Sequence, residues 1–374
     1  MFKHIARILL GLTFVFSGFV KGIDPWGSAY KFTDYFNAFQ MPWLTDMAFA
    51  LGIILAAAEF ALGVALLFNF FLRIMSWFTL AFMVFFTILT FVLALTNPVT
   101  DCGCFGDALI ITNWQTFYKN IVLLALAVYV FVQRKQFKSK DGPILSIALT
   151  AMTIVFYFYL VDYSYNHLPI IDFSPYKVGV NIPEAMKIPT GAPKAIYENN
   201  LIYKNVQTGE EKKFTDANYP WKDTLNWKFV KMGDQKLIQK GYTPPIHDFQ
   251  IETSESEDIK DFFLYDEKYT FIVVASNLQK TNREGMKRIV QLAAAAKIKG
   301  YNFIGLTATS PDSFGSLKSE MGIEFDLFNT DEITLKTIVR SNPGLIVIKK
   351  GTIVRKYHFN NVPKPEKIDS ELEP

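Results

Sequence analysis

The sequence predicts a membrane α-helical bundle followed by a small β-rich segment and an α/β domain. Half of its 374 residues are hydrophobic and 16% are aromatic. Its mean hydropathy of +0.18 is too high for a soluble chain of this length. The long apolar stretches all lie in roughly the first 165 residues. Short apolar runs then alternate with helical patterns, which is typical of a central sheet flanked by helices.

Each of five apolar stretches approaches the roughly 20 residues that a bilayer-crossing helix needs. They are Ile5–Ile23, Met47–Phe68, Ile74–Leu95, Trp114–Val132 and Ile144–Val161. No small-residue cleavage site follows the first stretch, so we expect a retained helix rather than a signal peptide. The predicted domains are a four-helix core, a fifth helix, a linker with the β-rich segment, and the α/β domain. Their ranges are 1–135, 136–163, 164–239 and 240–374.

Basic residues set the predicted orientation. Those near the expected cytoplasmic ends of the helices are Lys3, Arg7, Arg73, Arg134, Lys135, Lys138 and Lys140. The loop between the third and fourth stretches has no Lys or Arg. By the positive-inside rule, the N-terminus is cytoplasmic, and this loop and everything after Asp162 are outside. For a bacterium, this predicts an inner-membrane protein with a periplasmic C-terminal half.

A short aromatic segment lies between the first two stretches. Its rings, from Tyr30 to Phe39, alternate with polar residues between Pro25 and Pro42. This pattern predicts a small helix at headgroup level. It can act as a roof over the outer end of the bundle or simply as a membrane anchor.

Glu59, Lys21 and Lys119 are ionisable residues within the predicted helices. Glu59 is near the middle of the second, where a charge is costly unless it is protonated, paired or facing water. Lys21 and Lys119 are shallower and can snorkel outward. Glu59 lies about 18 Å below the start of its helix. A direct bond to Lys21 therefore requires offset helices, and we expect a hydrogen bond to a neighbouring helix instead. Packing and a proton or ligand role both remain open for Glu59.

Cys102 and Cys104 are the only cysteines of the chain, and they are separated by Gly103 in the outer loop. Such a spacing closes a very small disulfide ring, and strained, exposed disulfides are the labile ones. The pair therefore predicts thiol/disulfide exchange. A structural disulfide is an alternative, and metal ligation is disfavoured because no His is near in sequence. Lys119 and a helix start capped by Thr112 would both favour a thiolate here.

The segment from Phe16 to Lys21, Glu59 with the following Gly63, and the loop Cys-Gly-Cys-Phe-Gly-Asp resemble the DoxX/MauE group of membrane proteins over about residues 1–135. That group is similar to four-helix, quinone-linked thiol oxidases. The resemblance implies Cys102 and Cys104 as the catalytic pair, with a membrane quinone as electron acceptor. Supporting candidates are Asp101, Asp107, Lys119, Glu59 and Lys21. Those oxidases use two cysteine pairs, whereas this chain has one.

The second half begins with a proline-rich linker and a predicted hairpin. Residues 195–204 and 211–214 flank a turn-like stretch that ends at Gly209-Glu210. Strands at 271–275 and 303–307 then alternate with helices at 283–296 and 311–321. A last hairpin of 345–348 and 352–357 turns at Lys350-Gly351.

This order, with Pro343 just before the last hairpin, resembles the TlpA/peroxiredoxin branch of thioredoxin folds. In that branch the active cysteines follow the first central strand, and the late proline is cis. Here the loop reads Ala275-Ser276-Asn277-Leu278-Gln279-Lys280 and has no thiol. The domain is therefore predicted to be non-catalytic. Asn342 and Pro343 are candidates for binding an extended partner segment, against the alternative of a purely structural proline. The whole chain resembles DoxX-related proteins typical of Bacteroidota.

Two functions remain open from the sequence. The first is a quinone-linked thiol-disulfide oxidoreductase whose thioredoxin-like domain docks a periplasmic or envelope protein. The second is a non-catalytic membrane subunit of a larger envelope complex. A third possibility, a small-molecule carrier, is supported only by Glu59. No basic patch suggests nucleic acid, and we expect no metal.

The predicted topology can be tested with a protease added to spheroplasts. Because five crossings place residues after Asp162 outside, the protease should remove the C-terminal half. Protection of this half until the cells are lysed would contradict the five-crossing orientation.

Overall fold

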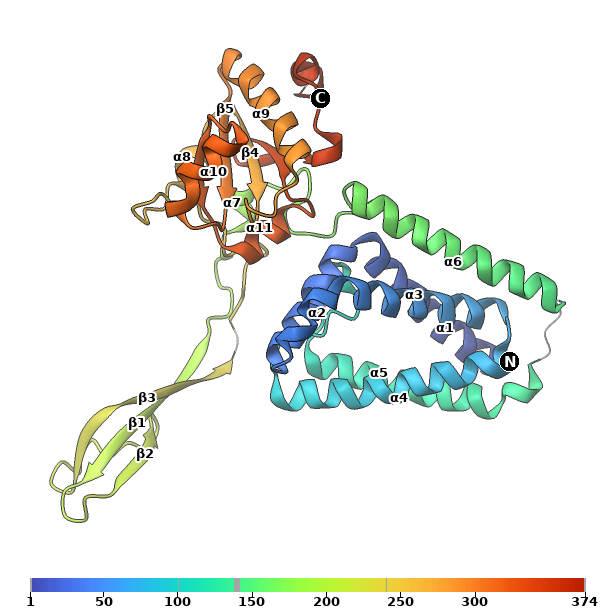
Figure 1. The fold of residues 1–374 in the computed structure, drawn as a ribbon. Coiled ribbons are helices and arrows are strands. Elements are labelled where there is room, and N and C mark those ends of the chain that lie inside the picture. Colours follow the sequence, from blue (N-terminus) through green and yellow to red (C-terminus); the bar gives the residue numbers. More distant parts are fainter. Residues whose placement is uncertain (1, 100, 138–141, 240, 373–374) are drawn as a thin grey trace. The chain divides into compact units, whose positions relative to one another are not determined.

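A computed structural model describes residues 2–99, 101–137, 142–239 and 241–372 (Figure 1). The chain forms two compact units, one of residues 1–181 with 248–374 and one of residues 182–247. In this described part, five helices are long and apolar enough to cross a membrane. They are α1 (Phe2–Ile23), α3 (Ala48–Phe68), α4 (Leu72–Thr96), α5 (Asn113–Val132) and α6 (Pro143–Asn166). The five predicted stretches are thus confirmed as helices. Lys138, Lys140 and Lys240 lie outside the described residues, and the domain boundaries stay predictions.

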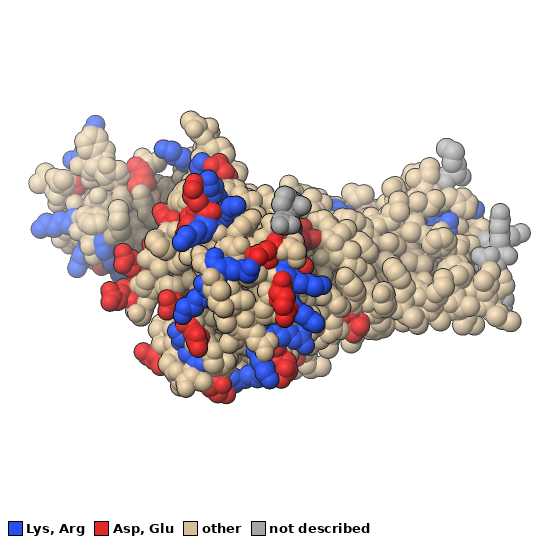
Figure 2. Space-filling view, turned by 90° about the horizontal axis from the view of Figure 1, so that it is seen from above, with Lys and Arg blue, Asp and Glu red and all other residues tan. Residues whose placement is uncertain are grey.

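The outer surface of the long helices is apolar. Ile54, Phe85 and Val155 are each more than half exposed, although they are large and hydrophobic. Figure 2 shows charged side chains gathered over one part of the visible surface and few of them where the bundle lies. A soluble protein rarely exposes such a broad apolar surface, so these side chains face lipid.

Glycines allow α1 and α3 to pack with almost no space between their backbones. A Cβ on Gly18 would lie 2.6 Å from the backbone nitrogen of Phe60. One on Gly63 would lie 2.5 Å from the backbone nitrogen of Val15. Small residues at such crossings are the usual device for close helix packing in membranes. This crossing fixes which side chains of the two helices meet.

A shorter helix, α2 (Pro25–Ala38), follows α1 directly. The carboxylate of Asp24 caps it by accepting from the backbone N–H of Gly27 at 2.9 Å, and Pro25 suits the first helical position. The predicted aromatic helix is thus confirmed, and it begins five residues before Tyr30 because cap and proline set its start.

Residues 182–247 form a separate unit with a short helix, α7 (Ile182–Ala185), and a three-stranded antiparallel sheet of order β2-β1-β3. The strands are β1 (Ile196–Asn205), β2 (Glu211–Thr215) and β3 (Trp227–Gln239). The predicted hairpin is confirmed by the pairing of β1 with β2. Aromatic rings hold the sheet together, with Tyr203 against Phe214 and Phe229.

The C-terminal domain is a five-stranded sheet of order β6-β5-β4-β7-β8, as in thioredoxin-like folds. Its strands are β4 (Tyr269–Ala275), β5 (Asn302–Thr307), β6 (Asp326–Asn329), β7 (Gly344–Lys349) and β8 (Thr352–His358). β4, β5 and β6 run parallel, and β7 is antiparallel to both β4 and β8. The helices are α8 (Lys260–Leu264), α9 (Arg283–Ile298), α10 (Phe314–Met321), α11 (Glu332–Ile338) and α12 (Ile368–Leu372).

The predicted strand-helix alternation of this domain is confirmed, but β6 and the helices α8, α11 and α12 were not predicted. β6 has four residues, too few for a period-2 pattern to stand out. It is held by its pairing with β5. The core lies between the sheet and α9, where Phe271 and Val273 pack against Met286 and Ile289.

The linker after α6 is fastened to β8. Lys356, on β8, pairs with Asp172 at 2.6 Å and is almost completely buried. Desolvation lowers the pKa of Lys356, and the Asp172 carboxylate opposes that shift. Gly179 donates its backbone N–H to Ile353 at 2.8 Å. The proline-broken segment is therefore ordered by contacts with the thioredoxin-like domain rather than by a helix of its own.

The α1/α3 crossing can be tested with two glycine-to-alanine substitutions. Gly18→Ala places a methyl group against the backbone of α3 and should lower the free energy of unfolding by about 1–3 kcal/mol. Gly52→Ala is the matched control, because its Cβ would meet ordinary van der Waals contacts at 3.6 Å. Thermal unfolding in detergent measures both, and equal melting temperatures would contradict this account of the crossing.

Candidate functional site: a dithiol at the end of the helix bundle

The loop that carries the cysteines is fastened where it leaves and re-enters the bundle. The amide of Asn113, at the start of α5, donates to Asn97 Oδ1 at 2.9 Å and to the carbonyl of Val99 at 2.8 Å. Thr112 caps α5 in a reciprocal capping box with Gln115, which confirms the predicted cap. The stems of the loop are therefore fixed by the ends of α4 and α5.

Gly103 lets the chain curl between the cysteines. Its φ of +62° is a left-handed conformation that glycine adopts without penalty. As a result, the Sγ atoms of Cys102 and Cys104 lie 2.8 Å apart. Both are free thiols in this structure; Cys102 is buried and Cys104 is partly exposed. The two sulfurs are placed to form and break a mutual bond.

Helix α2 holds the loop from one side. The hydroxyl of Tyr35 donates to the carbonyl of Cys102 at 2.6 Å. Lys31 pairs with Asp101 at 2.7 Å, and Asp101 in turn accepts from the backbone N–H of Gly103 at 2.9 Å. Burial raises the pKa of Tyr35, so its hydroxyl remains a neutral donor. Of the two roles left open for this helix, these contacts agree with that of a roof over one end of the bundle.

Charged and polar groups of α1 and α3 approach the loop from within the bundle. Lys21 Nζ lies 2.8 and 2.7 Å from the two carboxylate oxygens of Glu59. Ser17 Oγ lies 2.8 Å from Glu59 Oε2 and 2.7 Å from the carbonyl oxygen of Cys104. The expected hydrogen bond of Glu59 to a neighbouring helix is present. The expectation that Lys21 would not bond directly to Glu59 is wrong.

The direct ion pair between Lys21 and Glu59 forms because the first turns of α3 lie beyond the end of α1. Gly52, near the start of α3, faces Ser28 and Ala29 of α2, while Gly18, near the end of α1, faces Ala56 and Phe60. The first turns of α3 therefore run beside α2, and Glu59 is level with the last turns of α1. The predicted depth of Glu59 would separate it from Lys21 only if the end of α1 and the start of α3 lay at the same level.

Lys119 of α5 lies on the other side of the loop. Its Nζ is 4.3 Å from the centroid of the Phe105 ring, a cation–π contact. Phe105 also packs against Phe16 at 5.4 Å between centroids. The contact with Phe105 thus holds the positive charge of Lys119 close to Cys104.

The electrostatic surroundings make the two thiols unequal. A hydrogen bond from Cys102 lowers the pKa of Cys104 to about 6. Burial opposes this shift, and the charges of Lys119 and Lys21 reinforce it. The pKa of Cys102 is raised, first by the same hydrogen bond and then by burial. Near neutral pH, the pair therefore consists of a Cys104 thiolate that accepts a hydrogen bond from the Cys102 thiol.

The pair opens onto a cavity of about 580 Å³ between the helices. At its polar end are Cys102, Cys104, Asp107, Lys21, Glu59 and Lys119. Its apolar walls include Leu55 of α3 and Phe82, Phe86 and Leu89 of α4. Ile54 and Phe85, both exposed on the lipid-facing surface, also line it. The cavity thus joins the dithiol to the hydrocarbon region.

The structure brings together most of the site residues predicted from the sequence, but not Asn342 and Pro343. The Asn342–Pro343 peptide is cis. The Asn342 side chain donates to the carbonyl of Asn277 at 3.0 Å and accepts from Thr281 at 3.2 Å. These contacts tie the proline loop to the thiol-free loop after β4. A partner-binding role for Asn342 and Pro343 stays a prediction.

Ser17, Tyr35 and Arg340 were not predicted from the sequence as residues of the site. Ser17 precedes Lys21 by one helical turn, and this spacing could have revealed it. Arg340 contacts Asp24 and Asp107, 316 and 233 residues away, so no local signal marks it. Across the described ranges, no group of three or more His, Cys, Asp or Glu side chains could hold a metal ion.

Fold and site together define a membrane helix bundle with a dithiol at one end, joined to a thioredoxin-like domain without thiols. Residues 1–133 match the family described as methylamine utilisation protein MauE. Residues 197–240 match a domain of unknown function, DUF8463. The helical bundle is therefore similar to MauE membrane proteins, and in this chain it is followed by a thioredoxin-like domain.

Among characterised sequences, the chain is similar to Protein TlpB of Flavobacterium psychrophilum, with 31% identity over 173 residues. The match covers 44% of this chain and 45% of that protein, which is less than half of either. No solved structure matches the chain.

The inequality of the thiols can be tested by alkylating the reduced protein over a range of pH. Because its pKa is lowered to about 6, Cys104 should be alkylated at half its maximal rate near pH 6, and Cys102 only at much higher pH. Lys119→Met removes a charge that favours the thiolate and should move the Cys104 midpoint upward. Peptide mass spectrometry separates the two sites, and equal midpoints for both would contradict the assignment.

Proposed function

We propose that this protein is a membrane thiol-disulfide oxidoreductase that passes electrons from a partner dithiol, through Cys102 and Cys104, to a membrane quinone. One observation carries the proposal: the cysteines line the same cavity as the Lys21–Glu59 pair, and apolar, lipid-facing residues line it as well. Such a cavity allows a soluble reductant and a lipid-soluble oxidant to reach the same sulfur atoms.

The residues around the cavity fit a quinone. A volume of about 580 Å³ suits a small cyclic headgroup, since ligand pockets run from roughly 300 to 1,000 Å³. Phe82 and Phe86 provide an aromatic wall. Lys21 and Lys119 provide donors for a carbonyl oxygen at the polar end. Between Ile54 and Phe85, an isoprenoid chain could extend into the bilayer.

A bound quinone would accept two electrons and two protons. The reduced pair supplies the electrons: the Cys104 thiolate and the Cys102 thiol form one S–S bond, and the Cys102 proton is released. A partner dithiol then restores the pair. Its first thiolate attacks the disulfide to form a mixed disulfide, its second closes the partner's own disulfide, and both electrons stay on Cys102 and Cys104.

The second proton required by a quinone comes from the partner dithiol, which loses two protons when it forms its disulfide, whereas Cys102 takes up only one. The Ser17 network lies beside the cavity: its hydroxyl is within 2.8 Å of Glu59 Oε2 and of the Cys104 carbonyl oxygen, and it accepts from Lys21 Nζ at 3.1 Å.

In this proposal the protein lies in the bacterial inner membrane, with the dithiol and both later domains on the periplasmic side. The basic-residue asymmetry supports that orientation. Disulfides form and persist in that oxidising compartment, so it tolerates the oxidised pair. The thioredoxin-like domain would dock the envelope partner without thiol chemistry, because no cysteine lies outside the CxC pair.

A second function, a non-catalytic membrane subunit of an envelope complex, rests on a different observation. The chain has one cysteine pair and no thiol in the loop after β4. A relay through two pairs within one molecule is therefore impossible. If the protein is such a non-catalytic subunit, Cys102 and Cys104 would form a structural disulfide.

Thiol trapping in growing cells separates the two functions. Acid quenching and alkylation with a mass tag should reveal both oxidised and reduced forms, and blocking quinone reoxidation should shift the pair toward dithiol. Purified protein should also reduce a soluble quinone analogue when dithiothreitol is supplied. Cys104→Ser should lower this activity at least roughly 100-fold, because the thiolate is lost. A pair that stays oxidised under every condition would support the structural role.

A further inference from the structure

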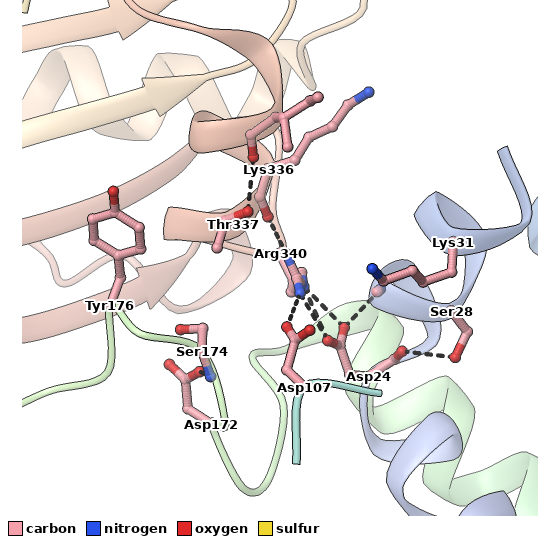
Figure 3. A network of polar contacts seen from close by, with 12 residues as sticks. Asp24, Ser28, Lys31, Asp107, Asp172, Ser174, Tyr176, Lys336, Thr337 and Arg340 are labelled. Atoms are coloured by element: carbon pink, nitrogen blue, oxygen red, sulfur yellow. Dashed lines mark hydrogen bonds and ion pairs between the residues drawn. The ribbon is translucent and has the colours of Figure 1, made fainter. Parts of the chain in front are cut away.

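Arg340 is a buried cation in the loop between α11 and β7. Its side chain is 9% exposed, and its guanidinium points between Asp24 and Asp107 (Figure 3). Nε lies 3.0 and 3.1 Å from the two carboxylate oxygens of Asp24. Nη2 lies 2.7 Å from Asp107 Oδ2 and 3.0 Å from Asp24 Oδ2. Nη1 donates to the carbonyl of Lys336.

The two carboxylates belong to the segments that hold the cysteines. Asp107 follows Cys104 by three residues in the same loop. Asp24 caps α2, the helix from which Tyr35 and Lys31 bind the loop. One guanidinium therefore joins the cysteine loop to the helix that covers it, and it does so from the thioredoxin-like domain.

This arrangement depends on the positive charge. Asp24 and Asp107 share one nitrogen atom of Arg340, so without the guanidinium these two partly buried carboxylates would repel each other. Burial raises the pKa of Asp107, and Arg340 acts against that shift. The Tyr30 ring of α2 adds a cation–π contact with Arg340, whose carbon Cζ is 5.6 Å from the ring centroid.

We propose that Arg340 is a positioning residue for the dithiol: it holds the cysteine loop against α2, which keeps the pair shielded and close to Lys119 and Lys21. The inference builds on the proposed thiol chemistry, because it assigns the thiol-free domain a part in it. Loss of the clamp would separate the loop from α2, expose Cys104 and reduce the influence of the lysines on its charge. The domain thus acts on the cysteines without touching them.

Alkylation of the full-length, reduced protein in detergent tests the proposal. In Arg340→Gln, the plateau rate of Cys104 alkylation at high pH should rise at least roughly tenfold, because the variant lacks the cation that pairs with both partly buried carboxylates. The midpoint of the pH profile should also move upward as Cys104 leaves the lysines. Arg283→Gln is the matched control. It removes an ion pair with Glu320 within the same domain, and both values should remain those of the unmodified protein.

A charge exchange separates positioning from a general loss of stability. Arg340→Asp combined with Asp107→Arg restores opposite charges and should return the plateau rate to near its original value, even if Arg340→Gln accumulates poorly. A folded Arg340→Gln protein with unchanged rate and midpoint would overturn the proposal. The proposal would also be overturned if the folded double variant were alkylated at Cys104 as fast as Arg340→Asp alone. These rates do not depend on a quinone or a partner, so failure of the proposed function leaves this result unaffected.

Discussion

The close packing of α1 against α3 is the constraint on which the site depends. Gly18 and Gly63 leave no room for a side chain between the two backbones. This close approach places the Lys21 ammonium against the Glu59 carboxylate within a predominantly apolar bundle. In such surroundings each charge is tolerated only because of the other. Ser17 then connects the ion pair to the carbonyl of Cys104. The position of the cysteine loop is therefore determined partly by a helix crossing deeper in the bundle.

The loop itself is held by groups from several directions. Tyr35 and Ser17 bind the carbonyls of Cys102 and Cys104, and Asn113 fastens its stem. These contacts use the backbone and leave both sulfurs free for chemistry. The hydrogen bond between the two sulfurs favours the charged form of Cys104 and the neutral form of Cys102, and the charges of Lys119 and Lys21 reinforce the effect on Cys104, so the two thiols differ even though one residue separates them.

Local patterns in the sequence predicted much of this fold. Apolar length predicted the five long helices, and alternation predicted the hairpins, because both signals are contained within single elements. The four-residue β6 lacked such a signal, since it is held by partners outside itself, namely β5 and the backbone of Glu252. The same reasoning applies to the site. The Cys-Gly-Cys spacing and Lys119 were visible locally. The Lys21–Glu59 bond depended on a helix offset that residue counting could not supply, and the partners of Arg340 lie hundreds of residues away.

The rim of the cavity has a consequence for how a ligand would be encountered. Ile54 and Phe85 belong both to the cavity lining and to the lipid-facing surface of the bundle. A hydrophobic molecule that enters between α3 and α4 therefore arrives from the bilayer, where its mole fraction, and not its aqueous concentration, sets occupancy. Partitioning then supplies much of the free energy of transfer from water. The cavity needs only modest intrinsic affinity, and a product that binds weakly can diffuse away laterally within the plane of the membrane.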